Sequence, residues 1–200
     1  MATSTVEAPR GRPRLWSLLA LAVLLPAAFA IASWRDVKDL LWAGELSPVA
    51  VPAGAAAPYA GARFRLDAFK IVTGERGDPR LKMPPDRALA LVRLEAVAER
   101  DVGELEWLAC ALTVLDDRGR RWKPLFLTLT RDVEKAIVPD AQETKGCSGA
   151  ALAPKPAGTR LLVQEAFLVP RDALASLKPS FSVGSARPEA LRFEGAAERR

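Results

Sequence analysis

The stretch LWSLLALAVLLPAAFAIASW, residues 15–34, contains no charged side chain. About twenty apolar residues in a helix are long enough to cross a hydrocarbon core of roughly 30 Å. Trp16 and Trp34 stand near its two ends, and amphipathic aromatic rings favour the membrane interface. We therefore expect a transmembrane signal anchor whose ends are Leu15 and Trp34, followed by a separate domain.

The charges on either side of this stretch predict its orientation. Three arginines precede it in the tail of residues 1–14, whereas Arg35 and Lys38 beyond it are offset by two nearby aspartates. Positive side chains next to a membrane span are retained on the cytoplasmic side. The tail is therefore expected in the cytoplasm, and residues 35–200 are expected on the outer side of the cell membrane.

A cleavable signal peptide is the alternative interpretation of the same stretch. It has a basic start, an apolar centre, the helix breaker Pro26, and the small residues Ala28 and Ala30 before a possible cleavage point. Cleavage after Ala30 would release a secreted protein. We favour a retained anchor because the apolar run continues without a charge to Trp34, and both interpretations export the rest of the chain.

The amino-acid composition excludes several classes of activity. The chain has 200 residues, a net charge of +5 and no histidine, which excludes histidine-based acid–base catalysis and histidine metal sites. It has no phosphate-binding loop, GxSxG elbow, HExxH motif or calcium loop, and two cysteines alone cannot close a zinc site. Basic residues do not form a block. We expect no cofactor, no metal site and no nucleic-acid partner.

Beyond the apolar stretch, the chain divides into segments that differ in composition and in the spacing of apolar residues. Residues 35–60 begin with apolar residues spaced i, i+3, i+4 and continue into a run rich in proline, alanine and glycine. We expect a juxtamembrane helix and an extended spacer there. Residues 61–195 are expected to form one extracytoplasmic domain, and residues 196–200 a frayed tail.

Strand patterns dominate the expected domain. Phe64, Leu66 and Ala68 alternate with polar residues, and the apolar phase then shifts by one residue, which predicts a β-bulge near Ala68. The very apolar stretch 105–115 predicts a central strand, which leads into a hairpin turn at 116–120. Further strands are expected at residues 88–98, 121–129, 159–169, 181–183 and 190–193.

These segments predict an all-β fold. About six or seven strands joined by irregular, Pro- and Gly-rich loops are typical of an antiparallel β-sandwich. An α/β fold would need helices between the strands, and the connecting segments contain too much proline and glycine for that. The core of the sandwich is expected to contain Leu108, Leu112, Val114, Phe167 and Val169.

Two segments resemble a known family. LTVLDDRGRRWKPL (112–125) is similar to the apolar strand, Asp-x-x-Gly turn, aromatic residue and proline of immunoglobulin-like bacterial extracytoplasmic domains. GTRLLVQEAFLVPRDALASLKPSF (158–181) resembles their later glycine, apolar strand and Phe-x-x-Pro segment. That family is a domain of unknown function found on lipoproteins and membrane-anchored proteins. The resemblance implies an immunoglobulin-like β-sandwich and supplies no catalytic residue.

The chain contains two cysteines, Cys110 in a predicted strand and Cys147 between glycines in a predicted loop. Disulfides persist in the oxidising environment outside the cytoplasm, so we expect a disulfide between them. Two free thiols, with Cys110 as a small core residue, are the alternative. A redox-active role is disfavoured because there is no CxxC pair and no histidine to lower the pKa of a thiol.

The leading hypothesis is a non-enzymatic, membrane-tethered envelope protein whose β-sandwich binds or positions another envelope component. The alternatives are a cleaved, secreted form of the same module and a carboxylate-based enzyme acting on envelope glycans. The sequence identifies no small-molecule ligand and assigns no catalytic residue. The acids available to such an enzyme flank turns or lie on polar strand faces, where acids are usually only solvated: Glu95, Asp101, Glu104, Glu106, Asp116 and Asp117.

Overall fold

The structure is a computed structural model that describes residues 12–43, 45, 47–73, 83–125 and 143–199. The chain divides into two compact units, Met1–Trp42 and Ala43–Arg200. The second unit contains both sheets.

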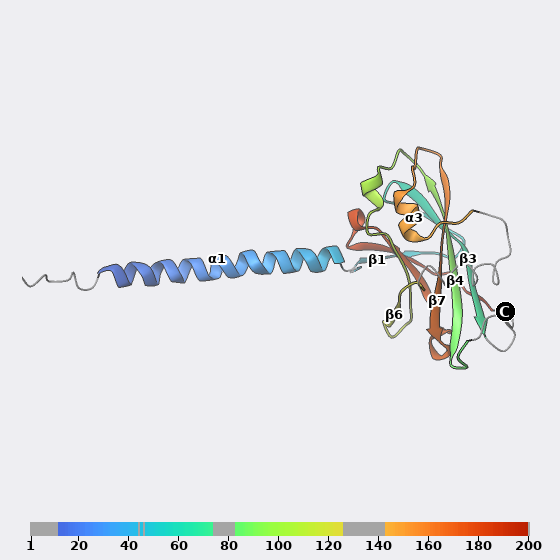
Figure 1. Cartoon of the computed structure of the whole chain (residues 1–200), viewed down its shortest axis with the longest axis horizontal. Coiled ribbons are helices and arrows are strands. Elements are labelled where there is room, and N and C mark those ends of the chain that lie inside the picture. The colour runs from blue at the N-terminus through green and yellow to red at the C-terminus, as the bar shows by residue number, and fades with distance from the viewer. Residues whose placement is uncertain (1–11, 44, 46, 74–82, 126–142, 200) are drawn as a thin grey trace, which may run out of the picture. The chain divides into compact units, whose positions relative to one another are not determined.

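The first unit contains one long helix, α1, Arg12–Ala43 (Figure 1). Within α1, Trp16–Trp34 is long and apolar enough to cross a membrane, with a mean hydropathy of 2.1. A signal sequence near an N-terminus passes the same test of length and composition. The helical pattern that follows the apolar stretch belongs to α1 itself and is not a separate element.

The described residues of the second unit are mostly strands joined by short helical turns. In chain order these elements are β1 Ser47–Val51, β2 Ala56–Tyr59, β3 Ala62–Thr73, β4 Arg87–Ala98, η1 Glu104–Trp107, β5 Ala111–Leu115, β6 Arg121–Trp122, α3 Cys147–Leu152, β7 Arg160–Pro170, η2 Arg171–Ala173, β8 Lys178–Ser182, η3 Gly184–Ala186, β9 Glu189–Phe193 and β10 Glu198–Arg199.

The strands form two sheets (Figure 1), and side chains from both sheets form one core. One sheet has the order β1-β9-β8-β5-β6, and the other has the order β10-β3-β4-β7 with β2 paired to β3. Leu112 and Phe181 from the first sheet pack in one cluster with Phe64 and Phe167 from the second. The rings of Phe64 and Phe181 have centroids 4.5 Å apart, so they join the two layers directly. This unit is therefore a β-sandwich.

The long strands β3, β4 and β7 follow the sequence patterns closely. All three pair antiparallel, and the register between β3 and β4 shifts between Leu66 and Ala68, which confirms the predicted bulge. Only part of the expected strand at 121–129 can be compared, because residues 126–129 lie outside the described part of the chain.

The expectation of a purely antiparallel sandwich is wrong at its edges. β1 runs parallel to β9, and β10 runs parallel to β3. β10 lies in the segment that was expected to fray. Its pairing with β3 gives the backbone there hydrogen-bond partners that the sequence pattern did not reveal.

β1 and β2 occupy the segment that was expected to be an extended spacer, so that expectation is also corrected. Val51 and Tyr59 are buried, and the Tyr59 hydroxyl donates a 2.8 Å hydrogen bond to the carbonyl oxygen of Glu189. Pro48 and Pro58 lie on strands at the edges of the sheets. A proline there removes no hydrogen bond from the sheet interior, so a proline-rich run is compatible with an edge strand.

The stretch 105–115 is not one strand. Glu104–Trp107 forms the 3₁₀ turn η1, and β5 begins only at Ala111. Ala109 lies between them with φ of 53°, in the left-handed region, where an extended strand cannot continue.

This break changes which side chains enter the core. Trp107 is buried, and its indole nitrogen donates a 3.0 Å hydrogen bond to the carbonyl oxygen of Ala60. Leu108 is 45% exposed, so its prediction as a core residue is wrong. The other four predicted core residues are buried as expected.

Candidate functional site

Cys110 and Cys147 are joined by a disulfide, with Cα atoms 5.5 Å apart. That separation lies in the usual range for a disulfide, and the pairing is the one expected from the sequence. Cys147 does not lie in a loop, however, because it is the first residue of the short helix α3. The disulfide therefore ties α3 to the residue immediately before β5.

Glu165 of β7 holds the start of α3 from a second direction. Its carboxylate oxygen Oε1 accepts a 2.6 Å hydrogen bond from the backbone nitrogen of Cys147. A Cβ atom at Gly146 would lie 3.1 Å from the same oxygen, so glycine permits this close approach. In the sequence, the feature that points to this role is that Glu165 is a single charged residue on the otherwise apolar face of the strand.

A pocket of about 300 Å³ opens beside the disulfide. Both cysteines line it, together with the polar side chains of Thr113, Lys123 and Ser148 and the carboxylate-bearing Glu165. Its volume is at the lower end of the range for small-ligand sites. The polar lining offers both hydrogen-bond donors and acceptors, so it suits a small group of mixed polarity, such as an amide. We refer to it as the disulfide pocket.

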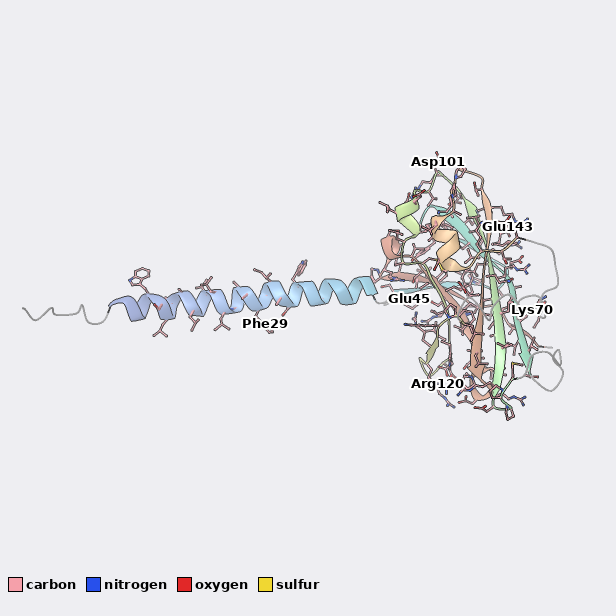
Figure 2. The ribbon with its side chains drawn as sticks, viewed as in Figure 1. Phe29, Glu45, Lys70, Asp101, Arg120 and Glu143 are labelled. Carbon is pink, nitrogen blue, oxygen red and sulfur yellow. A yellow bond between two sulfur atoms is a disulfide. The ribbon has the colours of Figure 1, made fainter. Side chains whose placement is uncertain are left out.

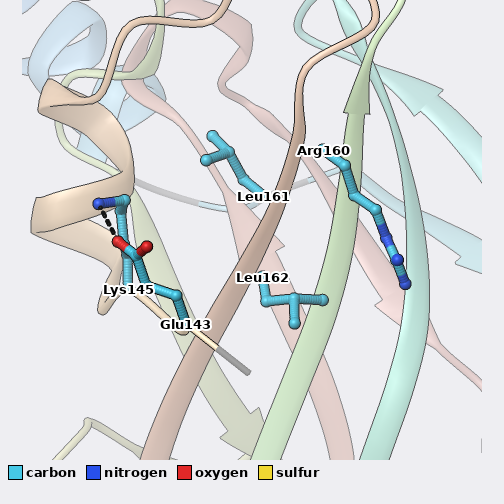
Figure 3. A pocket seen from close by; sticks show the side chains of 5 residues that line it. All are labelled: Glu143, Lys145, Arg160, Leu161 and Leu162. Atoms are coloured by element: carbon cyan, nitrogen blue, oxygen red, sulfur yellow. Dashed lines mark hydrogen bonds and ion pairs between the residues drawn. The ribbon is translucent and has the colours of Figure 1, made fainter. Parts of the chain in front are cut away.

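A second pocket, of about 390 Å³, is lined by Glu143, Lys145, Arg160, Leu161 and Leu162 (Figure 3). The Lys145 ammonium lies 3.0 Å from the Glu143 carboxylate. Arg160 forms an ion pair with Glu95 on the neighbouring strand. Each cation already has an acidic partner, so this pocket offers little attraction for an anionic ligand.

Lys155 is 2% exposed and lies against α3. Its ammonium donates hydrogen bonds to the carbonyl oxygens of Ala150, Ala151 and Ala153, at 3.2, 2.9 and 2.6 Å. It also lies 5.0 Å from the centre of the Trp107 ring.

Burial lowers the pKa of Lys155, and the charges of Glu104 and Glu106 act in the opposite direction. The three carbonyl oxygens and the aromatic ring stabilise the ammonium form. Lys155 is therefore best described as a cap that holds the end of α3 over η1. Sequence reasoning missed it, because a single lysine between two prolines carries no recognisable pattern.

Glu45 is a second residue that sequence reasoning missed (Figure 2). Its side chain is only 4% exposed and forms an ion pair with Arg121. Its carboxylate also accepts hydrogen bonds from the hydroxyls of Ser180, at 2.9 Å, and Ser182, at 2.6 Å. The chain is thus fixed to the β5-β8 region of the sheet only two residues after α1 ends. We refer to these contacts as the Glu45 clasp.

Most of the acids considered as catalytic candidates are engaged in local contacts. Glu95 pairs with Arg65 and Arg160. Asp116 accepts hydrogen bonds from the backbone and the side chain of Arg120, in the hairpin turn.

The remaining candidates lie in turns. Asp101 accepts a 2.8 Å hydrogen bond from the backbone of Ala157, and Asp117 accepts one of 3.0 Å from Ser176. Glu106 pairs with Arg100, which together with a backbone hydrogen bond lowers its pKa to about 2. Glu104 is exposed. These contacts account for five of the six candidate acids as turn and ion-pair residues. Among the described residues, no group of three or more His, Cys, Asp or Glu side chains could hold a metal ion.

No protein-family model and no curated protein matches this sequence. Solved structures that are similar in fold include the following three. The secreted protein MPT63 of Mycobacterium tuberculosis has 10% identity and a TM-score of 0.44, with 74% of this chain and 98% of that chain covered. An uncharacterized β-sandwich protein of Clostridium difficile has 7% identity and a TM-score of 0.38, covering 73% and 94%. A conserved hypothetical protein of Bacillus anthracis has 10% identity and a TM-score of 0.41, covering 70% and 95%. Similarity of this degree carries no conclusion about function.

Proposed function

We propose that α1 is retained as a single-pass anchor, with residues 1–14 in the cytoplasm, and that it tethers an extracytoplasmic, immunoglobulin-like sandwich. The sandwich binds or positions another protein of the cell envelope and carries out no catalysis. The observation that carries this proposal is the disulfide between Cys110 and Cys147 in the unit that follows a helix with an uncharged apolar stretch, Trp16–Trp34. A disulfide of this kind persists outside the cytoplasm.

The connection between α1 and the sandwich supports a tether of defined length. α1 ends at Ala43, Glu45 is buried in its clasp, and β1 begins at Ser47. This part of the described chain therefore contains no long flexible spacer. The short connection suits a module that acts close to the membrane surface.

The disulfide pocket is the proposed contact point for the partner. Lys123 and Glu165 offer opposite charges, and Thr113 and Ser148 offer hydroxyls, around an apolar wall that includes the disulfide. This lining suits a short loop of another protein, whose backbone amides supply both donors and acceptors. Binding is favoured over catalysis because five of the six candidate acids are engaged in turns and ion pairs.

The anchor is tested by N-terminal sequencing of the protein isolated from its native membrane. We expect the chain to start before Leu15 and to remain in the membrane fraction after a carbonate wash. A chain that starts at Ile31 would show that the apolar segment is a cleaved signal and that the mature protein is secreted.

Partner binding is tested by photo-crosslinking in intact cells. A photoreactive amino acid replaces Ser148, which is exposed and lines the disulfide pocket. The matched control replaces Asp86, whose side chain is 69% exposed and lies outside that pocket. We expect a discrete crosslinked protein from position 148 and none from position 86. Equal crosslinking at both positions, or none at either, would contradict the proposal.

A further inference from the structure

β5 is paired along only part of the side that faces β6. It pairs with β8 over its whole length, but with β6 only at Val114 and Leu115. The first three residues of β5 therefore have an open edge among the described residues. These three residues line the disulfide pocket: Ala111, Leu112 and Thr113.

The backbone hydrogen-bonding groups of Leu112 point toward this open edge. In the hairpin, the backbone nitrogen of Asp116 donates a 3.1 Å hydrogen bond to the carbonyl oxygen of Arg120, which places the backbone groups of Asp116 on the β6 side. In an antiparallel pair, the residues whose backbone groups face the partner strand alternate along the chain. Val114, opposite Trp122, therefore faces β6, and Leu112 faces the same side.

Pro124 explains why β6 does not continue past Leu112. In the register of β5 with β6, the residue opposite Leu112 would be Pro124, which has no N–H to donate. The next residue, Leu125, donates a 2.7 Å backbone hydrogen bond to the carbonyl oxygen of Ala166 in β7. The chain has thus crossed to the other sheet, and no backbone group of the described residues pairs with Leu112 on the β6 side.

An open donor and acceptor at Leu112 favour a partner with a matching backbone. Leu112 is 1% exposed, and a buried backbone group without a partner costs free energy comparable to a lost hydrogen bond. The disulfide pocket gives access to this position. An extended peptide supplies both an N–H and a C=O at the spacing of a strand, which is how peptides add to the open edges of sheets.

We propose that an extended segment of the partner protein adds to β5 inside the disulfide pocket and pairs with Leu112. This inference rests on the proposed function for the nature of the partner, a protein of the cell envelope. The segment takes the place that β6 would fill if it continued beyond Trp122. Because the pairing uses the backbone, it excludes proline at the segment residue opposite Leu112.

The pocket also limits the side chains of the segment. Leu112 packs in the core, whereas the Thr113 hydroxyl accepts a 3.3 Å hydrogen bond from Arg121 on the outer face of the sheet. The segment residue opposite Leu112 therefore points inward, beside the disulfide, where a pocket of about 300 Å³ suits a small apolar side chain such as valine. Its neighbours point outward like Thr113, and Lys123 of the lining favours acidic side chains there.

Hydrogen exchange of the full chain in detergent micelles tests for the open edge. We expect the amide of Leu112 to exchange about tenfold faster than the amide of Val114, which is paired with β6. Pro124→Val restores a donor opposite Leu112 and lets β6 continue, so exchange at Leu112 should fall to the rate of Val114. Equal rates in the wild-type chain would show that the edge is already covered and would overturn the proposal.

The probe for binding is the peptide Ac-Glu-Val-Glu-NHMe, whose equal flanks fit either chain direction. At a concentration equal to its Kd, it should slow exchange at Leu112 about twofold, because half of the protein is then bound. The matched control peptide contains N-methylvaline, which keeps the side chain but removes the central N–H, and it should leave the exchange unchanged. Equal effects of the two peptides, or no effect of either at millimolar concentration, would contradict strand addition.

Two proline variants connect this test to the partner in cells. The photoreactive amino acid at position 148 is combined with Pro124→Val or with Pro85→Val, whose proline is exposed in the turn before β4. We expect crosslinking to be lost with Pro124→Val and kept with Pro85→Val. Unchanged amide signals of Phe181, in β8, would show that both variants are folded.

The outcomes separate the two proposals. Equal crosslinking in both variants would show that the partner uses the disulfide pocket without pairing to β5, which overturns strand addition and leaves the proposed function standing. Binding of the peptide at Leu112 without any crosslinked protein in cells would overturn the proposed function and leave strand addition standing.

Discussion

The hydroxyl of Ser182 donates a 2.6 Å hydrogen bond to the carboxylate of Glu45, which lies 137 residues earlier in the chain. Ser180 and Arg121 complete the clasp around the same carboxylate. Glu45 lies two residues before the start of β1, so these contacts fix the place where the sandwich begins. In the sequence, Glu45 belongs to a segment that is expected to be a spacer. In the structure, its carboxylate is among the acids of the described chain that have the most partners.

Replacing Glu45 with alanine should destabilise the sandwich by about 2–3 kcal/mol, because two buried hydroxyls and Arg121 lose their acceptor. Urea unfolding of the full chain in detergent, followed by tryptophan fluorescence, measures this. Glu143→Ala is the matched control, since the Glu143 side chain is 83% exposed, and it should change stability by less than about 0.5 kcal/mol. Equal effects from both substitutions would show that the clasp contributes nothing.

Removing the disulfide by Cys110→Ala with Cys147→Ala should lower the free energy of unfolding by about 3–4 kcal/mol in the chain-entropy model. The crosslink closes a loop with a sequence separation of 37 residues. Comparison of the oxidised, reduced and doubly substituted proteins by urea unfolding measures the effect. Identical midpoints for the three forms would mean that the crosslink does not constrain the unfolded chain.

Leu112 and Leu108 form a matched pair for testing the core. Leu112 is 1% exposed, so Leu112→Ala should cost about 2–5 kcal/mol from lost burial and the cavity left behind. Leu108 is 45% exposed, and Leu108→Ala should cost less than about 1 kcal/mol. The prediction fails if the two substitutions lower the unfolding midpoint equally, because the break between η1 and β5 would then be misplaced.

Glu106 should give the sandwich a defined dependence on acid. Arg100 and the backbone of Gly103 lower its pKa from the ordinary 4.5 to about 2. Because the folded-state pKa is the lower one, the resulting stabilisation is complete above pH 4.5 and is lost as the pH falls towards 2. The side chain is 33% exposed, so solvent screening limits the contribution to about 1 kcal/mol or less.

Unfolding of the wild-type chain and of Glu106→Gln, measured between pH 2 and pH 6, tests this dependence. We expect the wild-type chain to be the more stable above about pH 4.5 and the two curves to converge near pH 2. A difference that stays constant across this range would mean that the Arg100–Glu106 pair does not shift the carboxyl group.

The sequence by itself determined the elements whose patterns repeat over many residues. Length and absence of charge predict the helix that contains Trp16–Trp34, and alternation of apolar and polar residues predicts β3, β4 and β7. The phase shift near Ala68 predicts the bulge, because side chains alternate sides along a strand and one extra residue reverses the pattern. These features depend on neighbours in the sequence, so they can be read from it.

Tertiary structure alone decided the edges of the sandwich and the contacts that hold its turns. The sequence around Pro48 and Pro58 suggests a spacer, yet both prolines lie in edge strands. An edge strand tolerates proline because it needs hydrogen bonds on one side only. The apolar run 105–115 breaks at Ala109, where the buried Trp107 and its bond to Ala60 favour a turn over a longer strand. Lys155 is partnered by carbonyl oxygens two to five residues before it, which its ammonium reaches only because α3 ends there. Glu45 acquires its role only when the hydroxyls of Ser180 and Ser182 reach it. A buried charge is stable only with such partners, and no local pattern in the sequence reveals the serines that the fold brings to Glu45 from more than a hundred residues away.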